Sequence, residues 1–511
     1  MNDPRRVLHP AAPGLPGAAD LVSRPTVAVV GGGIAGLAAA TALAERGVAV
    51  RLYERQPYLG GRVGGWQTQL PDGTPAAMNR GFHAFFRQYY NLRDLLRRVD
   101  PTLSMLSPLD DYPLVDARGR RDTFRGLPRT PPFNAMAFAL RSPTFRVRDL
   151  IRLDARAAAP LAAVSVPGTY DELDHQDAES FLRDINFPDA ARHLAFEVFS
   201  RSFFTRPAKL SAAELATMFH IYFLGSSEGL VFDVATSNFD AALWNPLGSY
   251  LERLGVRVRT GSSVHSVEPT ADNAFAVTDD SGEQLRADGV VLAADVSALQ
   301  AIVAGSPALG DPGWRERIGR LGTAAPFVVQ RLWLDRAVRA DRPAFMGTGG
   351  LPPLDNISVL ERYEREAAEW CARTGGSVVE LHAYSVDEDT PALREASIAR
   401  MHELYPETAQ ARIVHEETLC RNDCPRLAPG DFAERPSVHT PHPGLALAGD
   451  GIRIDLPVAL MERAATTGIS AANTLLAHFG VKGHDIYTVP VRGRSPVLRH
   501  LAGRVERRVP R

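Results

Sequence analysis

Cysteine is scarce in this chain: its 511 residues include only Cys371, Cys420 and Cys424. A sparse, odd set cannot form a disulfide framework, and this favours a reducing compartment, the cytoplasm. Cys420 and Cys424 could form one pair of metal ligands, but no second pair at zinc spacing accompanies them. We therefore interpret them as ordinary thiols and predict no metal site.

An excess of basic charge is also missing, since 57 lysines and arginines face 59 aspartates and glutamates. Nucleic-acid binding requires a basic surplus, so the balance excludes a global nucleic-acid footprint. The hydrophobic share of 45% and the charged share of 23% are ordinary for a globular protein. The length predicts two or three domains, which can be interleaved in sequence.

Long hydrophobic runs are absent as well. No stretch reaches the roughly 18 consecutive apolar residues that a membrane-spanning helix needs. Residues 1–24 are rich in proline and alanine and lack the apolar core of a signal peptide. We interpret them as a disordered lead-in.

A glycine-rich turn follows this segment. The apolar run Val27–Val30 is typical of a buried parallel strand, and an alanine- and leucine-rich stretch at helical spacing follows the turn. The first glycine permits the tight turn, the second lets a pyrophosphate approach the backbone, and the third lets helix and strand pack closely. The cofactor-binding residues predicted here are Gly31, Gly33, Ala35 and Gly36.

An acidic residue ends the next predicted strand. Glu54 lies 18 residues after Gly36, where a carboxylate accepts hydrogen bonds from ribose hydroxyls. A negative charge at this position disfavours a 2′-phosphate, so NADP is not expected. Strand, glycines, helix, second strand and acid together predict a dinucleotide-binding unit.

A second glycine motif, Gly60-Gly61-Arg62, follows the acid at short range. A glycine pair keeps the backbone close to a phosphate, and the guanidinium adds a charge-assisted contact. With this motif the chain resembles the superfamily of flavin-containing amine oxidases and carotenoid desaturases. The resemblance implies FAD as the cofactor.

The far end of the chain carries the same resemblance. Leu445–Ala448 predict a strand, Gly449 and Asp450 a turn, and the residues from about 460 a long helix. The resemblance implies that Asp450 holds the ribityl chain and that the backbone near Met461, at a helix start, faces the flavin pyrimidine edge. It also places the backbone of Val264 beside the adenine.

These segments predict an α/β fold with α+β inserts, in which a Rossmann-type FAD-binding domain of the amine oxidase/desaturase kind is interleaved with a substrate domain. The FAD-binding domain would comprise residues 25–104, 226–304 and 431–480. The substrate and membrane-contact domain would comprise 105–225 and 305–430, and a basic tail would follow at 481–511.

A stretch of mixed rings and charges, NRGFHAFFRQYYN at 79–91, sharpens the resemblance. Plant- and cyanobacterial-type phytoene and ζ-carotene desaturases carry a similar Gly-x-His-x-Phe-Phe run followed by Tyr-x-Asn. Arg80 and FRQYYNLR look more like the aromatic-carotenoid branch, the isorenieratene synthases or β-carotene desaturase/methyltransferases. The matching positions here are Gly81, His83, Phe85, Phe86, Tyr89 and Asn91.

This branch implies an FAD-dependent enzyme that oxidises the β-rings of an apolar carotene to aromatic rings with a methyl shift. A linear phytoene or ζ-carotene desaturase is one alternative, and a flavin amine oxidase is another. A prenyl-binding carrier on the same fold is disfavoured by the intact Gly60-Gly61-Arg62 motif and Asp450.

Two residues of the stretch have open roles. His83 is a candidate base for the proton loss that completes aromatisation, or it holds the turn through a structural hydrogen bond. Arg80 is the second candidate at the catalytic centre, where it contacts the cofactor or pairs with an acid of the substrate domain. A cation beside a carbocation is unhelpful, which argues against direct catalysis by Arg80.

Two segments suggest a peripheral contact with the inner face of the cell membrane. Residues 133–148 alternate hydrophobic residues (Phe133, Met136, Phe138, Leu140, Phe145) with Arg141, Arg146 and Arg148. The basic C-terminus places Val497, Leu498, Leu501 and Val505 on one helical face. Basic amphipathic helices lie in the headgroup plane, although a helix packed on its own domain and a disordered tail are equal alternatives.

Overall fold

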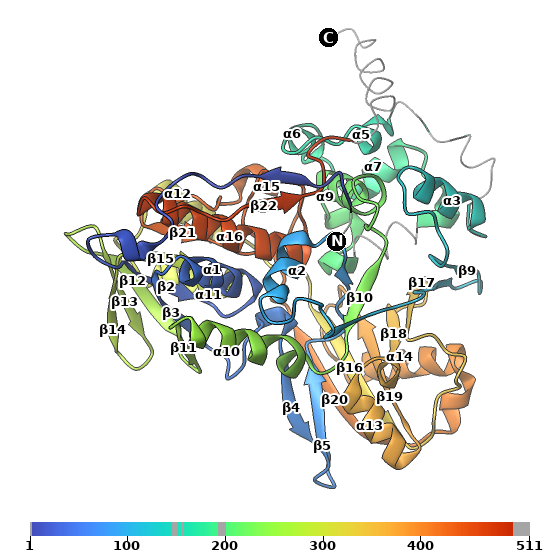
Figure 1. The fold of residues 1–511 in the computed structure, drawn as a ribbon. Helices are drawn as coiled ribbons and strands as arrows, with labels where there is room; N and C mark the ends of the chain where they lie inside the picture. The colour runs from blue at the N-terminus through green and yellow to red at the C-terminus, as the bar shows by residue number, and fades with distance from the viewer. Residues whose placement is uncertain (1–2, 146–151, 153, 155–156, 193–200, 494–511) are drawn as a thin grey trace.

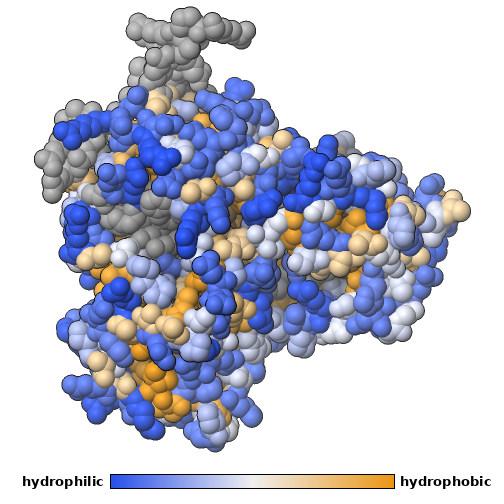
Figure 2. Space-filling model, turned by 180° about the vertical axis from the view of Figure 1, so that it is seen from behind, coloured by the Kyte–Doolittle hydropathy of each residue, from blue (hydrophilic) through white to orange (hydrophobic). Residues whose placement is uncertain are grey.

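The computed structural model describes residues 3–145, 152, 154, 157–192 and 201–493. Figure 1 shows three parts: a parallel sheet with its helices, a second sheet with helices on one side, and a cluster of short helices. Hydrophobic residues on the rear face are mostly interspersed with hydrophilic ones (Figure 2). Parts of the two predicted membrane-contact segments lie outside the described residues. These parts are Arg146 and Arg148 in the first segment and residues 497–505 in the second.

The first part is built on a five-stranded parallel sheet in the order β11-β3-β2-β15-β21. Its strands come from three separate stretches of the chain, so the sheet itself is discontinuous in sequence. Their bounds are β2 Thr26–Val30, β3 Ala49–Glu54, β11 Arg257–Thr260, β15 Gly289–Leu292 and β21 Leu445–Leu447.

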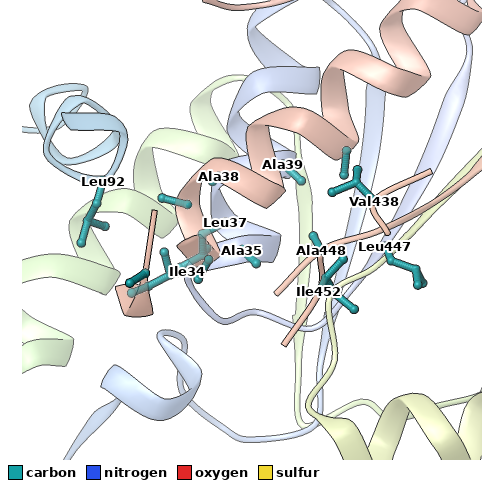
Figure 3. Packing of buried hydrophobic residues seen from close by; sticks show 14 of the residues in the cluster. Ile34, Ala35, Leu37, Ala38, Ala39, Leu92, Val438, Leu447, Ala448 and Ile452 are labelled. Carbon is teal, nitrogen blue, oxygen red and sulfur yellow. The ribbon is translucent and has the colours of Figure 1, made fainter. Parts of the chain in front are cut away.

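Two long helices, α1 (Ile34–Glu45) and α16 (Leu460–His478), pack against each other beside this sheet (Figures 1 and 3). Their backbones approach closely, because a Cβ added at Gly468 would lie 2.2 Å from the Ala35 carbonyl oxygen. Small side chains on α1, among them Ala38 and Ala39, fill this layer (Figure 3). The strands, turn and helices expected at both ends of the chain are confirmed.

Smaller elements complete the first part. A three-stranded antiparallel sheet, a hairpin, the helix after the aromatic stretch and three further helices surround it. Their bounds are β12 Val264–Pro269, β13 Phe275–Asp279, β14 Gln284–Ala287, β4 Gly65–Gln69, β5 Pro75–Asn79, α2 Tyr90–Arg97, α10 Asn245–Arg253, α11 Val296–Ala304 and α12 Pro312–Arg320.

The second part is a seven-stranded sheet in the order β20-β16-β19-β18-β17-β8-β9. Both interleaved stretches of the predicted substrate domain supply strands to it, and α13 and α14 pack beside it (Figure 1). The bounds are β8 Leu114–Asp116, β9 Arg121–Asp122, β16 Phe327–Leu334, β17 Phe345–Gly349, β18 Asn356–Val359, β19 Ser377–Ala383, β20 Ile413–Arg421, α13 Arg365–Thr374 and α14 Pro391–Leu404.

The third part is a cluster of short helices in the upper right of Figure 1. The bounds are α3 Phe133–Arg141, α5 Ala159–Ala162, α6 Gly168–Leu173, α7 Ala178–Asp184, α9 Ala212–Phe219 and α15 Asp431–Glu434. Two single helical turns of π type occur at His220–Leu224 and Asp240–Trp244. Turns of 3-10 type occur at 18–20, 61–63, 189–191, 201–203, 207–209, 360–362 and 406–410.

A small sheet, β6-β10-β7, joins the three parts. Its strands are β6 Phe85–Phe86, β7 Leu106–Pro108 and β10 Phe232–Ala235. The short strand β6 lies between the turn at Gly81 and α2. Pairing with β10 holds Phe85 and Phe86 extended.

The prediction of a disordered lead-in is wrong for residues 3–24. Strand β1 (Val7–His9) pairs antiparallel with β22 (Ile486–Thr488) near the other end of the chain. Leu15 then exchanges backbone hydrogen bonds with Gly480 and Lys482. Composition suggested disorder, but the N-terminal backbone finds its partners in a segment more than 400 residues away, which no local pattern shows.

Candidate functional site

A cavity of about 590 Å³ runs from the carboxyl edge of the parallel sheet to the second sheet. One end is lined by the glycine turns after β2 and β3, and the other by aromatic side chains. This position agrees with the general rule that open α/β sheets bind ligands beyond the carboxyl ends of their strands.

The first glycine turn has the geometry that its spacing predicts. Gly31 has φ +110°, a conformation that L residues with side chains rarely adopt. A Cβ at Gly36 would lie 1.8 Å from the Gly31 oxygen, so only glycine lets α1 start this close to the turn. Gly33 caps α1 without a side chain, and Gly33 and Ala35 both line the cavity.

Glu54 lies at the end of β3 beside this turn and is buried. Its carboxylate accepts hydrogen bonds from the backbone N–H groups of Gly32 and Gln56, both at 2.7 Å. Burial raises the pKa of Glu54, and the two backbone hydrogen bonds oppose that rise. Glu54 also lines the cavity, where further lone pairs can accept ligand hydroxyl groups.

The second glycine motif packs against the first. Gly60 has φ +95°, and a Cβ there would lie 2.2 Å from Nε1 of Trp244. A Cβ at Gly61 would lie 3.1 Å from the Gly33 Cα, so the two motifs leave an open backbone cradle. Trp244 donates a hydrogen bond to the Val63 oxygen at 2.6 Å and so anchors the second motif.

Arg62 pairs with Asp450 across the cavity. The predicted turn residues Gly449 and Asp450 thereby meet the second glycine motif, although the two lie far apart in sequence. Val264 at the start of β12 and Met461 in the first turn of α16 also line the cavity. The cavity thus brings together every cofactor-binding residue that the sequence predicts except Gly36, which instead sets the helix position.

His83 lies in the turn between β5 and β6, and its Nδ1–H donates to the Gly81 oxygen at 2.9 Å. Burial lowers the pKa of His83 to about 4, so the ring is neutral. Its imidazole meets the Phe239 ring edge-on, with centroids 5.6 Å apart. The hydrogen bond that the turn-holding alternative requires is therefore present.

Arg80 forms a two-point ion pair with Asp423, at 2.7 and 2.9 Å, and both residues line the cavity. Asp423 belongs to the stretch predicted as substrate domain. Arg80 therefore has the acidic partner that the pairing alternative requires. The Asp423 carboxylate neutralises a buried cation that would otherwise repel positive charge in the cavity.

Aromatic rings form much of the remaining wall. Phe82 stacks on Phe345 with centroids 4.2 Å apart, and Tyr112 lies 4.6 Å from Phe232. The rings lining the cavity in this part are Phe82, Phe86, Tyr89, Tyr112, Phe203, Phe204, Phe232, Phe345 and Tyr384. Such a wall suits a flat apolar molecule.

Sequence reasoning missed several residues around the cavity. Arg463 and Arg435 both donate to the buried Glu214 carboxylate, at 2.7 and 2.8 Å. Burial opposes its ionisation, but the two arginines lower the pKa of Glu214 to about 2. No local spacing reveals this cluster, because its three members lie on α9, α16 and the segment after α15.

Known proteins share this architecture. The model of the family "Flavin containing amine oxidoreductase" matches residues 34–476. The chain belongs to the flavin-containing amine oxidoreductase family. Wild-type putrescine oxidase bound to putrescine superposes with a TM-score of 0.64 at 15% identity, over 89% of this chain and 99% of the other, which shows the shared fold.

Within the family, sequence relatives act on carotenoids. The chain is 58% identical to the carotenoid phi-ring synthase of Streptomyces griseus, over 94% of this chain and 93% of the relative. It is 26% identical to the zeta-carotene desaturase of Synechocystis sp., over 88% of this chain and 97% of the relative.

The cofactor of this family member is FAD, and the residues present fit it. The cradle of Gly33 and Gly61 would be filled by a Cβ, the buried Glu54 lies beside it, and Arg62 supplies a cation. Across the described ranges no group of three or more metal-ligating side chains is found. Over the same part of the chain no helix is both long and apolar enough to cross a membrane.

Proposed function

We propose that this chain is an FAD-dependent carotenoid desaturase that converts the β-rings of a carotene into aromatic rings with a methyl shift. The 58% identity to a carotenoid phi-ring synthase over 94% of the chain carries the proposal. A linear desaturase has weaker support, since the zeta-carotene desaturase is 26% identical.

Both ends of the cavity support this assignment, because one end suits the cofactor and the other suits an apolar substrate. Bound FAD would accept hydride from an allylic carbon of the substrate. The chain supplies the cradle of Gly33 and Gly61 for the diphosphate and the Glu54 carboxylate for the ribose. In the same proposal Val264 lies beside the adenine, Asp450 holds the ribityl chain with Arg62, and Met461 at the start of α16 faces the flavin ring.

The aromatic wall orients the polyene. The rings of Phe82, Phe345 and Phe232 exclude water and present negative faces to a ring that gains positive charge. Arg80 does not oppose that charge, because Asp423 pairs with it. His83 holds the turn that presents Phe82.

The domain assignment is part of the proposal. Residues 25–104, 226–304 and 431–480 make the FAD-binding domain, and residues 105–225 and 305–430 make the substrate domain. The parallel sheet draws all its strands from the first set, and the seven-stranded sheet draws all its strands from the second.

Helix α3 is proposed as a contact with the membrane surface, from which an apolar carotene must be collected. Phe133, Met136 and Leu140, at helical spacing i, i+3 and i+7, are 58%, 54% and 68% exposed. Arg125, Arg129 and Arg141 are exposed nearby, while Asp122, the one acid among residues 117–145, is buried. An apolar face with basic neighbours suits an anionic lipid surface.

A chain of rings connects this helix with the cavity. On the inner side of α3, the Phe138 ring stacks on Phe124 at 4.8 Å. Phe124 stacks on Tyr112 at 4.3 Å, and Tyr112 lines the cavity. A continuous row of aromatic side chains therefore connects the proposed lipid contact with the proposed active site.

Pigment analysis tests the proposal. The chain is expressed in a host that makes β-carotene, beside a matched host with an empty vector. New carotenoids with aromatic end rings are expected by chromatography and mass spectrometry. Unchanged β-carotene, together with conversion of phytoene or ζ-carotene in a host that makes those, would transfer the chain to the linear desaturases.

A further inference from the structure

A line of polar side chains interrupts the aromatic wall of the cavity. Asp355, Asn356 and Tyr384 line the cavity where β18 begins beside the end of β19. Burying polar side chains against an apolar polyene costs free energy. We therefore expect these groups to take part in the reaction.

Tyr384 is the outer member of a hydrogen-bonded series. Glu380, His382 and Tyr384 alternate along β19 and just beyond it, so their side chains share one face. His382 Nδ1 lies 2.7 Å from the Tyr384 hydroxyl oxygen, and His382 Nε2 lies 2.8 Å from a carboxylate oxygen of Glu380. The series leads from the cavity wall into the protein core.

The inner end of the series is an ionised carboxylate. Arg331 on β16 donates two hydrogen bonds to the other Glu380 oxygen, at 2.8 and 3.0 Å. Burial opposes ionisation, but Arg331 and His382 lower the pKa of Glu380 to about 2. The carboxylate therefore accepts a hydrogen bond from His382 Nε2–H, which leaves Nδ1 as the acceptor for the Tyr384 hydroxyl.

The outer end is held in place. Asn356 donates a hydrogen bond from Nδ2 to the Tyr384 oxygen at 3.0 Å, and the Asp355 carboxylate accepts one from the Tyr384 backbone N–H. The Tyr384 O–H therefore has a defined direction, toward His382.

The turn of the aromatic stretch fits against this series. Gly81 has φ +99°, and a Cβ there would lie 2.8 Å from His382 Cε1. The His382 ring therefore occupies the space that a side chain at position 81 would need. This places the series next to the residues that carry the carotenoid resemblance.

We propose that Tyr384 is the catalytic residue that takes the proton lost in ring aromatisation, with His382 and Glu380 as positioning residues behind it. The inference rests on the proposed function. Loss of a hydride, which bound FAD would accept, and the methyl shift would leave a ring cation. The electron pair of a neighbouring ring C–H bond becomes a ring double bond, and its proton goes to the Tyr384 oxygen. The proton of Tyr384 goes to His382 Nδ1, and Glu380 pairs with the imidazolium.

His83 is less suited to this step. Its Nδ1–H donates to the Gly81 carbonyl, and within the described part of the chain no carboxylate pairs with its ring to stabilise an imidazolium. Burial and the nearby guanidinium groups of Arg80 and Arg62 disfavour its protonated form. His382, in contrast, has an ionised carboxylate in direct contact.

The test compares Tyr384→Phe with Tyr405→Phe. Tyr405 is a buried tyrosine at the end of α14, packed in a core cluster with Met401 and absent from the cavity lining. Purified FAD-loaded proteins receive β-carotene in phospholipid vesicles with a quinone as electron acceptor. We expect Tyr384→Phe to form aromatic product ~100-fold more slowly than wild type, as is typical for loss of a general base. Tyr405→Phe is expected to match wild type.

Two further readouts separate catalysis from folding. Wild type is expected to form aromatic product more slowly in D₂O, and Tyr384→Phe to lose this isotope effect. In protein labelled with ¹⁵N-histidine, the Nδ1 resonance of His382, assigned by its absence in His382→Gln, is expected to shift in Tyr384→Phe even without substrate.

The possible outcomes distinguish failure of this inference from failure of the proposed function. Aromatic product from Tyr384→Phe within threefold of the wild-type rate would overturn the inference. If Tyr384→Phe does not retain FAD, the wild-type isotope effect decides, and its absence would overturn the inference. If wild type itself makes no aromatic product, the proposed function fails instead.

Discussion

Gly81 leaves no space for a side chain, because His382 and Val329 occupy the position of its Cβ at 2.8 and 2.9 Å. We predict that Gly81→Ala lowers the free energy of unfolding by about 1–3 kcal/mol through backbone strain and displaces His382. Denaturant unfolding and formation of aromatic product measure the two effects.

Gly73 provides a matched control for this change. It also has a positive φ, +81°, but a Cβ there would meet no atom within 4 Å. Gly73→Ala should therefore show backbone strain alone and keep its product formation. If Gly81→Ala and Gly73→Ala formed aromatic product at equal rates, the position of His382 would not affect the reaction. This result would contradict its proposed role.

Glu364 predicts a pH dependence of stability. Burial raises the pKa of this carboxyl from 4.5 to about 7, with Arg331 opposing and Glu380 assisting the rise. Because the folded-state pKa is raised, this stabilising contribution is complete below about pH 4.5 and is lost as the pH rises through about 7.

Glu364→Gln mimics the protonated form and removes this titration. Relative to the variant, wild type should lose thermal stability between pH 5 and pH 8. Melting temperatures of both proteins across that range, by circular dichroism, check the prediction. A constant difference between the two curves would show that Glu364 does not titrate in this window.

At the scale of elements, the crossing of α1 and α16 ties the two ends of the chain into one cofactor site. A side chain at Gly468 would push α16 away from the Ala35 carbonyl and so shift the start of α1. We predict that Gly468→Val destabilises the protein by about 1–3 kcal/mol and weakens FAD retention. Flavin absorbance after gel filtration measures the retention.

Gly319 on α12 is the control for this change, because a Cβ there meets no atom within 4 Å. Gly319→Ala should leave the flavin content unchanged and stabilise the protein by a few tenths to about 1 kcal/mol. Full FAD retention by Gly468→Val would show that the helix crossing does not control the site.

Helix α3 predicts lipid binding. The triple variant Phe133→Ser, Met136→Ser and Leu140→Ser should reduce binding to anionic vesicles at least about tenfold, because each large apolar side chain contributes roughly 1.5–3 kcal/mol when buried. Cosedimentation with vesicles of anionic and of zwitterionic lipid measures the binding. Val414→Ser, an exposed position on β20, is the control. Unchanged cosedimentation of the triple variant would refute α3 as the lipid contact.

At the scale of the whole molecule, local signals predicted the cofactor end well. The turn at Gly31, the acid Glu54 and the strand and helix before and after Asp450 depend on residues adjacent in sequence. The constraint on each is local: a positive φ, a close backbone approach or a helix start. Such constraints are visible as residue types at fixed spacing.

The substrate end was less predictable, because its contacts join distant segments. The partner of Arg80 is Asp423, and the space beside Gly81 is filled by His382. The alternation of Glu380-Leu381-His382-Ala383-Tyr384 is typical of a strand with a polar series on one face. Recognising that series requires knowing that Arg331 and the cavity lie beside it.

The pairing of the two chain ends was equally hidden. Proline and alanine near the N-terminus favour disorder by composition, yet β1 finds β22. Long-range backbone pairing overrode local preference here, as tertiary context commonly does.

The most direct measurement of the central claim is the electron count of the reaction. Converting one β-ring into an aromatic ring requires two two-electron oxidations, so the purified FAD protein should consume two equivalents of quinone per aromatic ring formed from β-carotene. Anaerobic titration with product quantification by mass spectrometry gives this ratio. Quinone consumption without aromatic rings, or no quinone reduction with β-carotene at all, would contradict the account.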